Sequence, residues 1–94
     1  MDELTEIKIR ANFRRIAGKS IVKAENKFIE KLKSDPSRSP EPWNAYPFSF
    51  HLERMGHEYD ELQNAKTAEQ KRGECLDVGL FAMFGWASLE EDKK

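Results

Sequence analysis

Residues 57–86 read HEYDELQNAKTAEQKRGECLDVGLFAMFGW and contain two pairs of carboxylates, Glu58/Glu61 and Glu74/Asp77. Each pair has i,i+3 spacing, which on an α-helix places both side chains on one face with Cβ atoms about 5–6 Å apart. The segment NAKTAEQ between the pairs reads as a turn followed by a new helix start. If the chain reverses midway, each pair lies roughly 11 Å from the bend at 1.5 Å of rise per residue. The pattern therefore predicts four carboxylates facing one another across a helical hairpin.

Composition limits what such a chain can be. Its 94 residues, 35% charged and 38% hydrophobic, predict one domain of solvated helices, each with one apolar face. The net charge of −1 argues against a dedicated nucleic-acid binder. A single cysteine, Cys75, excludes an intramolecular disulfide and favours a reducing compartment, and we expect it to be a small core residue. With no apolar leader and no apolar run near 18 residues, we expect a cytoplasmic protein without membrane or nucleic-acid partners.

A long helix is predicted over residues 3–33, where apolar side chains recur at steps of three and four. Asp2 or Thr5 can cap its start. Gly18 inside a helix costs about 1 kcal/mol relative to Ala, so a break there, with Ser20 as a second N-cap, stays open. The apolar stripe, expected to be buried, consists of Ile9, Phe13, Ile16, Ala17, Ile21, Ala24, Phe28 and Leu32.

The same helix carries a row of cations at strict i,i+4 spacing: Lys19, Lys23, Lys27 and Lys31. Such a row is commonly a solvated helix face. The alternative is that one or two of these lysines reach a ligand that carries phosphate. Both interpretations stay open at this point.

A loop is predicted over residues 34–48, because its four prolines lack backbone donors and disfavour helix in the residues before them. Loops of this length in a compact domain are often functional. This one contains Trp43, Asn44, Tyr46 and Phe48. These residues either cover one end of the core or form a ligand site in which Trp43 stacks on a planar group and Asn44 reads its edge.

Two further helices are predicted, over residues 50–64 and 67–88, followed by a frayed, solvated tail over 89–94. Ser49 has the character of an N-cap for the first. Thr67 and Gln70 form a capping-box pattern for the second.

The second half of the last helix, VGLFAMFGWA, is apolar on nearly every side and must be buried all round. A single chain of this size cannot surround it, whereas a dimer that packs two hairpins together can. The predicted architecture is therefore all-α. It consists of a helical hairpin with a long N-terminal helix, dimerising into a four-helix-bundle core.

The acidic pairs favour a metal site. Carboxylates are hard ligands suited to Mg²⁺, Mn²⁺ or Ca²⁺, and Mg²⁺ commonly bridges a few carboxylates to substrate phosphates. Isolated Glu-x-x-Glu pairs occur by chance on charged helices, but two pairs placed symmetrically about a turn and beside an apolar half-helix are rarer. Di-iron bundles need Glu-x-x-His, whereas Glu53 precedes His57 by four. One Cys and two His do not make a usual zinc site, so His51 and His57 read as ordinary polar residues.

The order of these elements resembles a known family. Glu58-x-x-Glu61, twelve residues, Glu74-x-x-Asp77 and then VGLFAMF are similar to the signature of the MazG-like all-α nucleoside triphosphate pyrophosphohydrolases, which include dimeric dUTPases and dCTP pyrophosphatases. The resemblance covers about residues 43–86.

The resemblance implies hydrolysis of a nucleoside triphosphate to the monophosphate and pyrophosphate, as part of clearing the nucleotide pool. It also implies Mg²⁺, with Mn²⁺ as a substitute, held by the two acidic pairs Glu58/Glu61 and Glu74/Asp77. Within this set Glu61 also activates the attacking water. A cation from Lys71 or Arg72 would meet the phosphates, although a surface role for Lys71 is an equal alternative. The base pocket would include Trp43, Asn44 and Phe81, although Phe81 also fits a core role.

The implied partners are the nucleotide and a second copy of the chain, as a homodimer or a dimer of dimers. Two other classes of function stay open. One is a helical dimerisation or regulatory module whose acidic residues only tune charge. The other is a family member that binds nucleotide as a sensor without turning it over.

Overall fold

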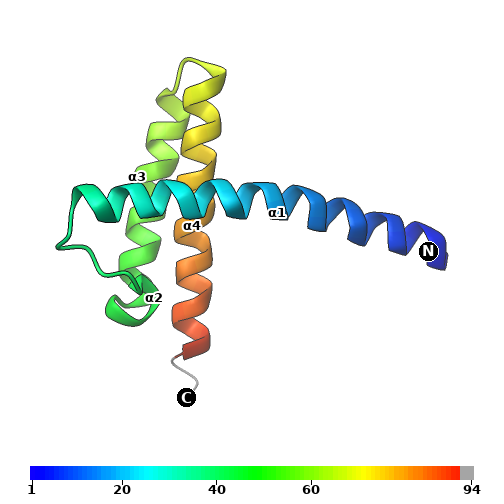
Figure 1. Ribbon diagram of the computed structural model, residues 1–94, viewed down its shortest axis with the longest axis horizontal. Helices are drawn as coiled ribbons and strands as arrows, with labels where there is room; N and C mark the ends of the chain where they lie inside the picture. Colours follow the sequence, from blue (N-terminus) through cyan, green and yellow to red (C-terminus); the bar gives the residue numbers. More distant parts are fainter. Residues whose placement is uncertain (92–94) are drawn as a thin grey trace.

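The computed structural model describes residues 1–91, and within them all regular structure is helical. The elements are α1 (Glu3–Ser34), α2 (Pro42–Ala45), α3 (Phe48–Asn64) and α4 (Ala68–Glu91). Helices α3 and α4 form an antiparallel hairpin, and α1 crosses the middle of that hairpin at a steep angle (Figure 1). The prediction of an all-α fold is confirmed.

Two of the predicted helix caps are present. At the start of α1, the Asp2 carboxylate accepts a hydrogen bond from the Thr5 amide at 2.7 Å. At the start of α4, the Gln70 amide donates to Thr67 Oγ1 at 3.1 Å, and Gln70 Oε1 accepts from the Thr67 amide at 3.3 Å. This reciprocal pair satisfies backbone donors that the first turn of a helix leaves free, which fixes the reversal between α3 and α4.

The predicted start of α3 is wrong. Ser49 lies inside the helix, which begins at Phe48 rather than at residue 50 and has Pro47 at the N-cap position. Pro47 is extended (φ −72°, ψ 166°), and its carbonyl accepts from the Phe50 amide at 3.0 Å. Because the proline ring fixes φ and Pro47 lies directly before the first turn, the helix starts two residues early.

Other boundaries also differ from the prediction. The loop predicted over residues 34–48 contains the one-turn helix α2, which begins at Pro42, a residue pre-organised for the first helical position. Helix α1 runs to Ser34, and α4 begins at Ala68 and continues to Glu91. The predicted frayed tail is therefore helical over 89–91, and its remaining residues, 92–94, lie outside the described part of the chain.

Helix α1 is continuous through Gly18, and Ser20 donates to the Ala17 carbonyl at 3.0 Å instead of capping a second helix. The expected burial of its whole apolar stripe is wrong for the single chain. Ala24 is buried where α1 crosses α4, but Phe13 is 72% exposed. The physical reason is visible in Figure 1, where the N-terminal half of α1 extends beyond the hairpin.

The core lies where α4 meets the other three helices. It consists of Ala24, Leu80, Phe81 and Phe84, with Phe28, Trp43 and Met55 packed against them. Trp86 on the far side of α4 is 67% exposed, so one chain buries α4 on one side only. Among residues 1–91, no helix combines the length and apolarity that crossing a membrane requires.

Candidate metal centre and adjoining pocket

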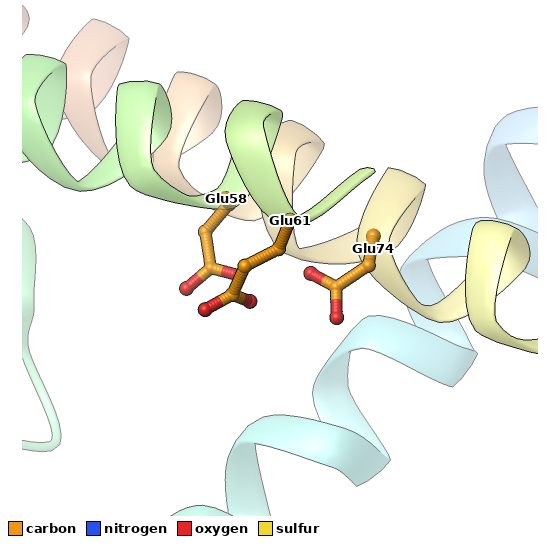
Figure 2. Close-up of side chains that lie close together, drawn as sticks. All are labelled: Glu58, Glu61 and Glu74. Atoms are coloured by element: carbon orange, nitrogen blue, oxygen red, sulfur yellow. The ribbon is translucent and has the colours of Figure 1, made fainter. Parts of the chain in front are cut away.

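Three of the four predicted metal ligands converge. Glu58 and Glu61 from α3 and Glu74 from α4 point into one space near the turn of the hairpin (Figure 2). One oxygen from each of the three carboxylates lies within 4.8 Å of the others. Glu58 is buried, Glu74 is half-buried and Glu61 is exposed, so the group, here called the acidic cluster, opens to solvent at Glu61.

The acidic cluster carries unbalanced negative charge. Burial, then hydrogen bonds with Glu61 and Glu74, then the charge of Asp77 raise the pKa of Glu58 to about 7. Arg54 Nη2 donates to Glu58 Oε1 at 3.1 Å, so one cation is present but does not outweigh burial and the neighbouring acids. Protonation of Glu58 or a bound cation would relieve the repulsion among these acids.

One oxygen of the acidic cluster has no hydrogen-bond partner within the described chain. Glu74 Oε2 is buried as an atom and accepts nothing. Buried polar atoms are normally satisfied, and a cation bound among these acids would satisfy this one. Three carboxylate oxygens within 4.8 Å of one another also match in type the oxygen ligands that Mg²⁺ and Mn²⁺ prefer. The residues present therefore fit a hard divalent cation.

The fourth predicted ligand, Asp77, has different partners. Its carboxylate is 6% exposed and accepts from Lys27 Nζ at 2.8 Å and from Lys31 Nζ at 3.4 Å. Lys27 Nζ also donates to the Gly73 carbonyl at 3.0 Å. Asp77 thus anchors α1 to α4 through two ion pairs. Two of the four lysines in the row on α1, Lys27 and Lys31, therefore face the hairpin. This structural role was not among the two interpretations drawn from the spacing of the row.

A pocket of about 340 Å³ lies between α1, α2, α3 and α4. Its apolar side is formed by Phe28, Pro42, Tyr46, Phe50, Leu80, Phe81 and Phe84, and its polar side by Lys31, Asp35, Arg38, Ser39 and Arg54. The Arg54 guanidinium lies 5.5 Å from the centroid of the Phe81 ring, within cation–π range. Arg54 therefore lines this pocket while pairing with Glu58 in the acidic cluster.

Of the residues predicted for a base pocket, the structure brings one to this pocket. Phe81 forms part of its apolar side. Trp43 packs on Phe84, with ring centroids 5.9 Å apart, but is not among the lining residues. Asn44 is exposed and donates from its side-chain amide to Glu41 at 3.3 Å. Sequence reasoning missed Arg54, although its position four residues before Glu58 was the available signal.

The two predicted phosphate-binding cations, Lys71 and Arg72, are exposed in the turn of α4 before Glu74. A second hollow, of about 370 Å³, lies where the end of α3 meets the start of α4. It is lined by Asp60, Glu61, Asn64, Ala65, Gln70 and Glu74. The acidic cluster thus has open space on the turn side as well as a pocket behind Arg54.

The two histidines and the single cysteine differ in their exposure to solvent. His51, predicted from the sequence to be an ordinary polar residue, is fully buried among the rings of Tyr46, Phe50 and Phe84. His57 is exposed, with Nδ1 at 3.4 Å from Arg54 Nη1. Cys75 is exposed, so its prediction as a small core residue is wrong: it lies on the solvent side of α4.

The chain was also compared with known proteins. A protein of Archaeoglobus fulgidus, described as uncharacterized, is 33% identical over 78 residues, which cover 80% of this chain and 83% of the archaeal protein. This chain belongs to the same family as that archaeal protein. No family model and no solved structure matches the chain. Family membership thus assigns no activity, and a functional proposal depends on the geometry of the site.

Proposed function

We propose that this chain is a Mg²⁺-dependent nucleoside triphosphate pyrophosphohydrolase of the MazG-like kind, with Mn²⁺ as a substitute metal. The observation that carries the proposal is the convergence of three carboxylates from two helices, one of which leaves a buried oxygen without a partner. The resemblance of the two acidic pairs and the following apolar half-helix to the MazG-like signature supplies the reaction class.

In the proposed reaction, a water oxygen bonds to the α-phosphorus as the bridging bond between the α- and β-phosphates breaks, releasing the monophosphate and pyrophosphate. Mg²⁺, when bound, supplies positive charge that offsets the charge of the leaving group and lowers the pKa of water. Glu58 and Glu74 would hold the metal together with Glu61. Glu61, the exposed member of the acidic cluster, also orients the attacking water and accepts its proton.

The remaining parts of the nucleotide are assigned by position. The nucleoside enters the pocket beside Arg54, where Phe81 and other aromatic side chains offer flat apolar surfaces. Trp43 packs on Phe84, which lines this pocket, and Asn44 belongs to α2, whose first residue, Pro42, also lines it. We assign the β- and γ-phosphates to the exposed cations Lys71 and Arg72, in the turn of α4 before Glu74.

Asp77 is the member of the proposed ligand set with the weakest support. Its two ion pairs with Lys27 and Lys31 must be exchanged before it binds metal. We therefore propose Glu58, Glu61 and Glu74 as the working set and assign Asp77 to holding α1 in place beside it.

The exposed apolar side chains support a dimer as the working form. Phe13 and Ile16 on α1 and Met83 and Trp86 on α4 are each at least 45% exposed. Large exposed apolar surface commonly marks a protein–protein interface. A second copy of the chain would cover α4 and form the four-helix core. Sedimentation equilibrium should give at least twice the mass of the 11.0 kDa chain, and a monomer at all concentrations would contradict this part.

A panel of the eight common NTPs and dNTPs, incubated with Mg²⁺ and assayed separately for pyrophosphate and orthophosphate, tests the activity. We expect pyrophosphate from at least one nucleotide and no orthophosphate. Glu61→Gln should remove the activity, whereas the matched change Glu53→Gln, at an exposed acid on the same helix, should leave it unchanged. Orthophosphate as the product, or no product from any nucleotide, would contradict the proposal.

A second candidate is a nucleotide sensor without catalysis, and the ion pairs of Asp77 favour it, because they remove one acid from the metal site. A sensor would bind nucleotide and Mg²⁺ in the same assay without releasing any pyrophosphate. A purely structural dimerisation module would bind neither.

A further inference from the structure

Arg54 touches two different environments. Its Nη2 is 3.1 Å from Glu58 Oε1, and its guanidinium also lies over the ring of Phe81, which lines the pocket. The Arg54 side chain is 37% exposed, whereas that of Glu58 is 5% exposed. The arginine is therefore the more solvent-accessible partner of the pair, and it lies between the acidic cluster and the pocket.

The position of Arg54 conflicts with metal binding. A divalent cation held by Glu58, Glu61 and Glu74 would neutralise Glu58 and compete with the guanidinium for its oxygens. Two cations beside one carboxylate repel each other. An arginine displaced from Glu58 is still attached to α3 one helical turn away and still lines the pocket that contains Phe81.

We propose that Arg54 is an exchangeable counter-ion. It pairs with Glu58 while the acidic cluster is empty, and it transfers to a phosphate oxygen of a nucleotide once a divalent cation occupies that cluster. This inference rests on the proposed function. A guanidinium binds phosphate by two parallel hydrogen bonds, and the boundary between cluster and pocket is where the phosphate nearest the nucleoside would lie. Arg54 is thus a binding residue for that phosphate, and it links metal loading to nucleotide affinity.

The exchange predicts opposite effects of one substitution on two ligands. Arg54→Gln removes a cation that competes with metal, so the affinity for Mn²⁺ alone should rise about threefold, the scale of a partly exposed ion pair. The same change removes a charge-assisted contact with phosphate. The affinity for α,β-methylene deoxynucleoside triphosphates in excess Mg²⁺ should therefore fall at least about tenfold.

The experiment measures both affinities on the full chain. Mn²⁺ binding is measured by the electron paramagnetic resonance signal of the free ion. Binding of the α,β-methylene analogues of the four common deoxynucleoside triphosphates is measured by calorimetry. Arg10→Gln is a matched control, because Arg10 forms another i,i+4 pair, with Glu6, at the far end of α1. Arg54→Lys keeps the charge, so its Mn²⁺ affinity should stay near wild type while analogue binding is only partly restored.

Tighter Mn²⁺ binding together with weaker analogue binding would support the exchange. If Arg54→Gln weakens or does not change Mn²⁺ binding, or leaves analogue binding at the wild-type level, the exchange is wrong while the metal site stands. If the wild type binds no Mn²⁺, the proposed function and the exchange both fail. Circular dichroism of each variant shows whether the helices are retained.

Discussion

Glu74 and Asp77 are one turn apart on α4, yet their carboxylates have opposite surroundings. Asp77 is compensated by two lysines from α1, at 2.8 and 3.4 Å. Glu74 lies with two other acids and leaves a buried oxygen without a partner. A compensated acid stabilises the fold, whereas an uncompensated group stores repulsion that an external cation can relieve. From this difference we expect Asp77 to hold the helices together and Glu74 to bind a ligand.

The strongest test of this division is Glu74→Gln. The neutral amide is a poor Mg²⁺ ligand, so we expect Mg²⁺-dependent pyrophosphate release to fall at least about 100-fold, at the upper end of what loss of a supporting group costs. The metal-free protein should unfold at the same or a higher temperature, because a repulsive charge is gone. Glu69→Gln, an exposed acid in the first turn of α4, is the control and should retain full activity.

Asp77→Asn should have the opposite profile. The amide cannot neutralise Lys27 and Lys31, so we expect the free energy of unfolding to fall by about 2–3 kcal/mol, below the full value for a buried pair because the lysines are partly exposed. Urea titration measures this loss, and hydrogen exchange should rise in the C-terminal half of α1. Mn²⁺ affinity should stay within about threefold of wild type. A stable variant that no longer binds Mn²⁺ would reverse the two assignments.

The pH dependence of stability tests the repulsion within the acidic cluster through its buried member, Glu58. Glu58 has an ordinary carboxyl pKa near 4.5 when unfolded and a raised pKa of about 7 when folded. The folded state therefore holds the proton more tightly, and its advantage is present at low pH and lost as pH rises from about 4.5 to about 7. Thermal melts in EDTA should show stability declining by up to about 3 kcal/mol across that interval. Saturating Mg²⁺ should cancel the decline, and so should Glu58→Gln. A flat profile in EDTA would show that the acidic cluster stores no repulsion.

The smallest expected effects distinguish the two lysines. Lys27 is closer to Asp77 and also donates to the Gly73 carbonyl, whereas Lys31 makes the longer contact alone. Lys27→Met should cost about 1 kcal/mol and Lys31→Met about half of that, in line with partly exposed ion pairs. Equal losses in urea titrations would show that the second contact of Lys27 contributes nothing.

Local features of the sequence predicted most of the fold. The capping pair Thr67 and Gln70 located the start of α4, and the i,i+3 spacing about that turn placed Glu58, Glu61 and Glu74 in one cluster. These relations involve helices joined by a short turn, so helix geometry alone determines them.

Contacts of α1 could not be predicted in this way. The ion pairs of Asp77 depend on where α1 crosses the hairpin, a relation between residues 46 and 50 positions apart in the chain. Periodicity showed that the α1 lysines share a face but not what that face meets. The pocket was missed for the same reason, because Phe28, Arg54 and Phe81 come from three different helices. Periodicity likewise identified the apolar stripe of α1 but not that Phe13 and Ile16 within it are exposed in the single chain.

The most direct test of the metal site is crystallographic. Crystals grown without divalent metal and soaked in Mn²⁺ would locate the ion by anomalous scattering. We predict a peak bonded to carboxylate oxygens of Glu58, Glu61 and Glu74, with Asp77 still paired to Lys27 and no such peak in crystals of Glu74→Gln. Mn²⁺ bound at Asp77 with the lysines displaced, or the absence of any peak at the acidic cluster, would contradict this account.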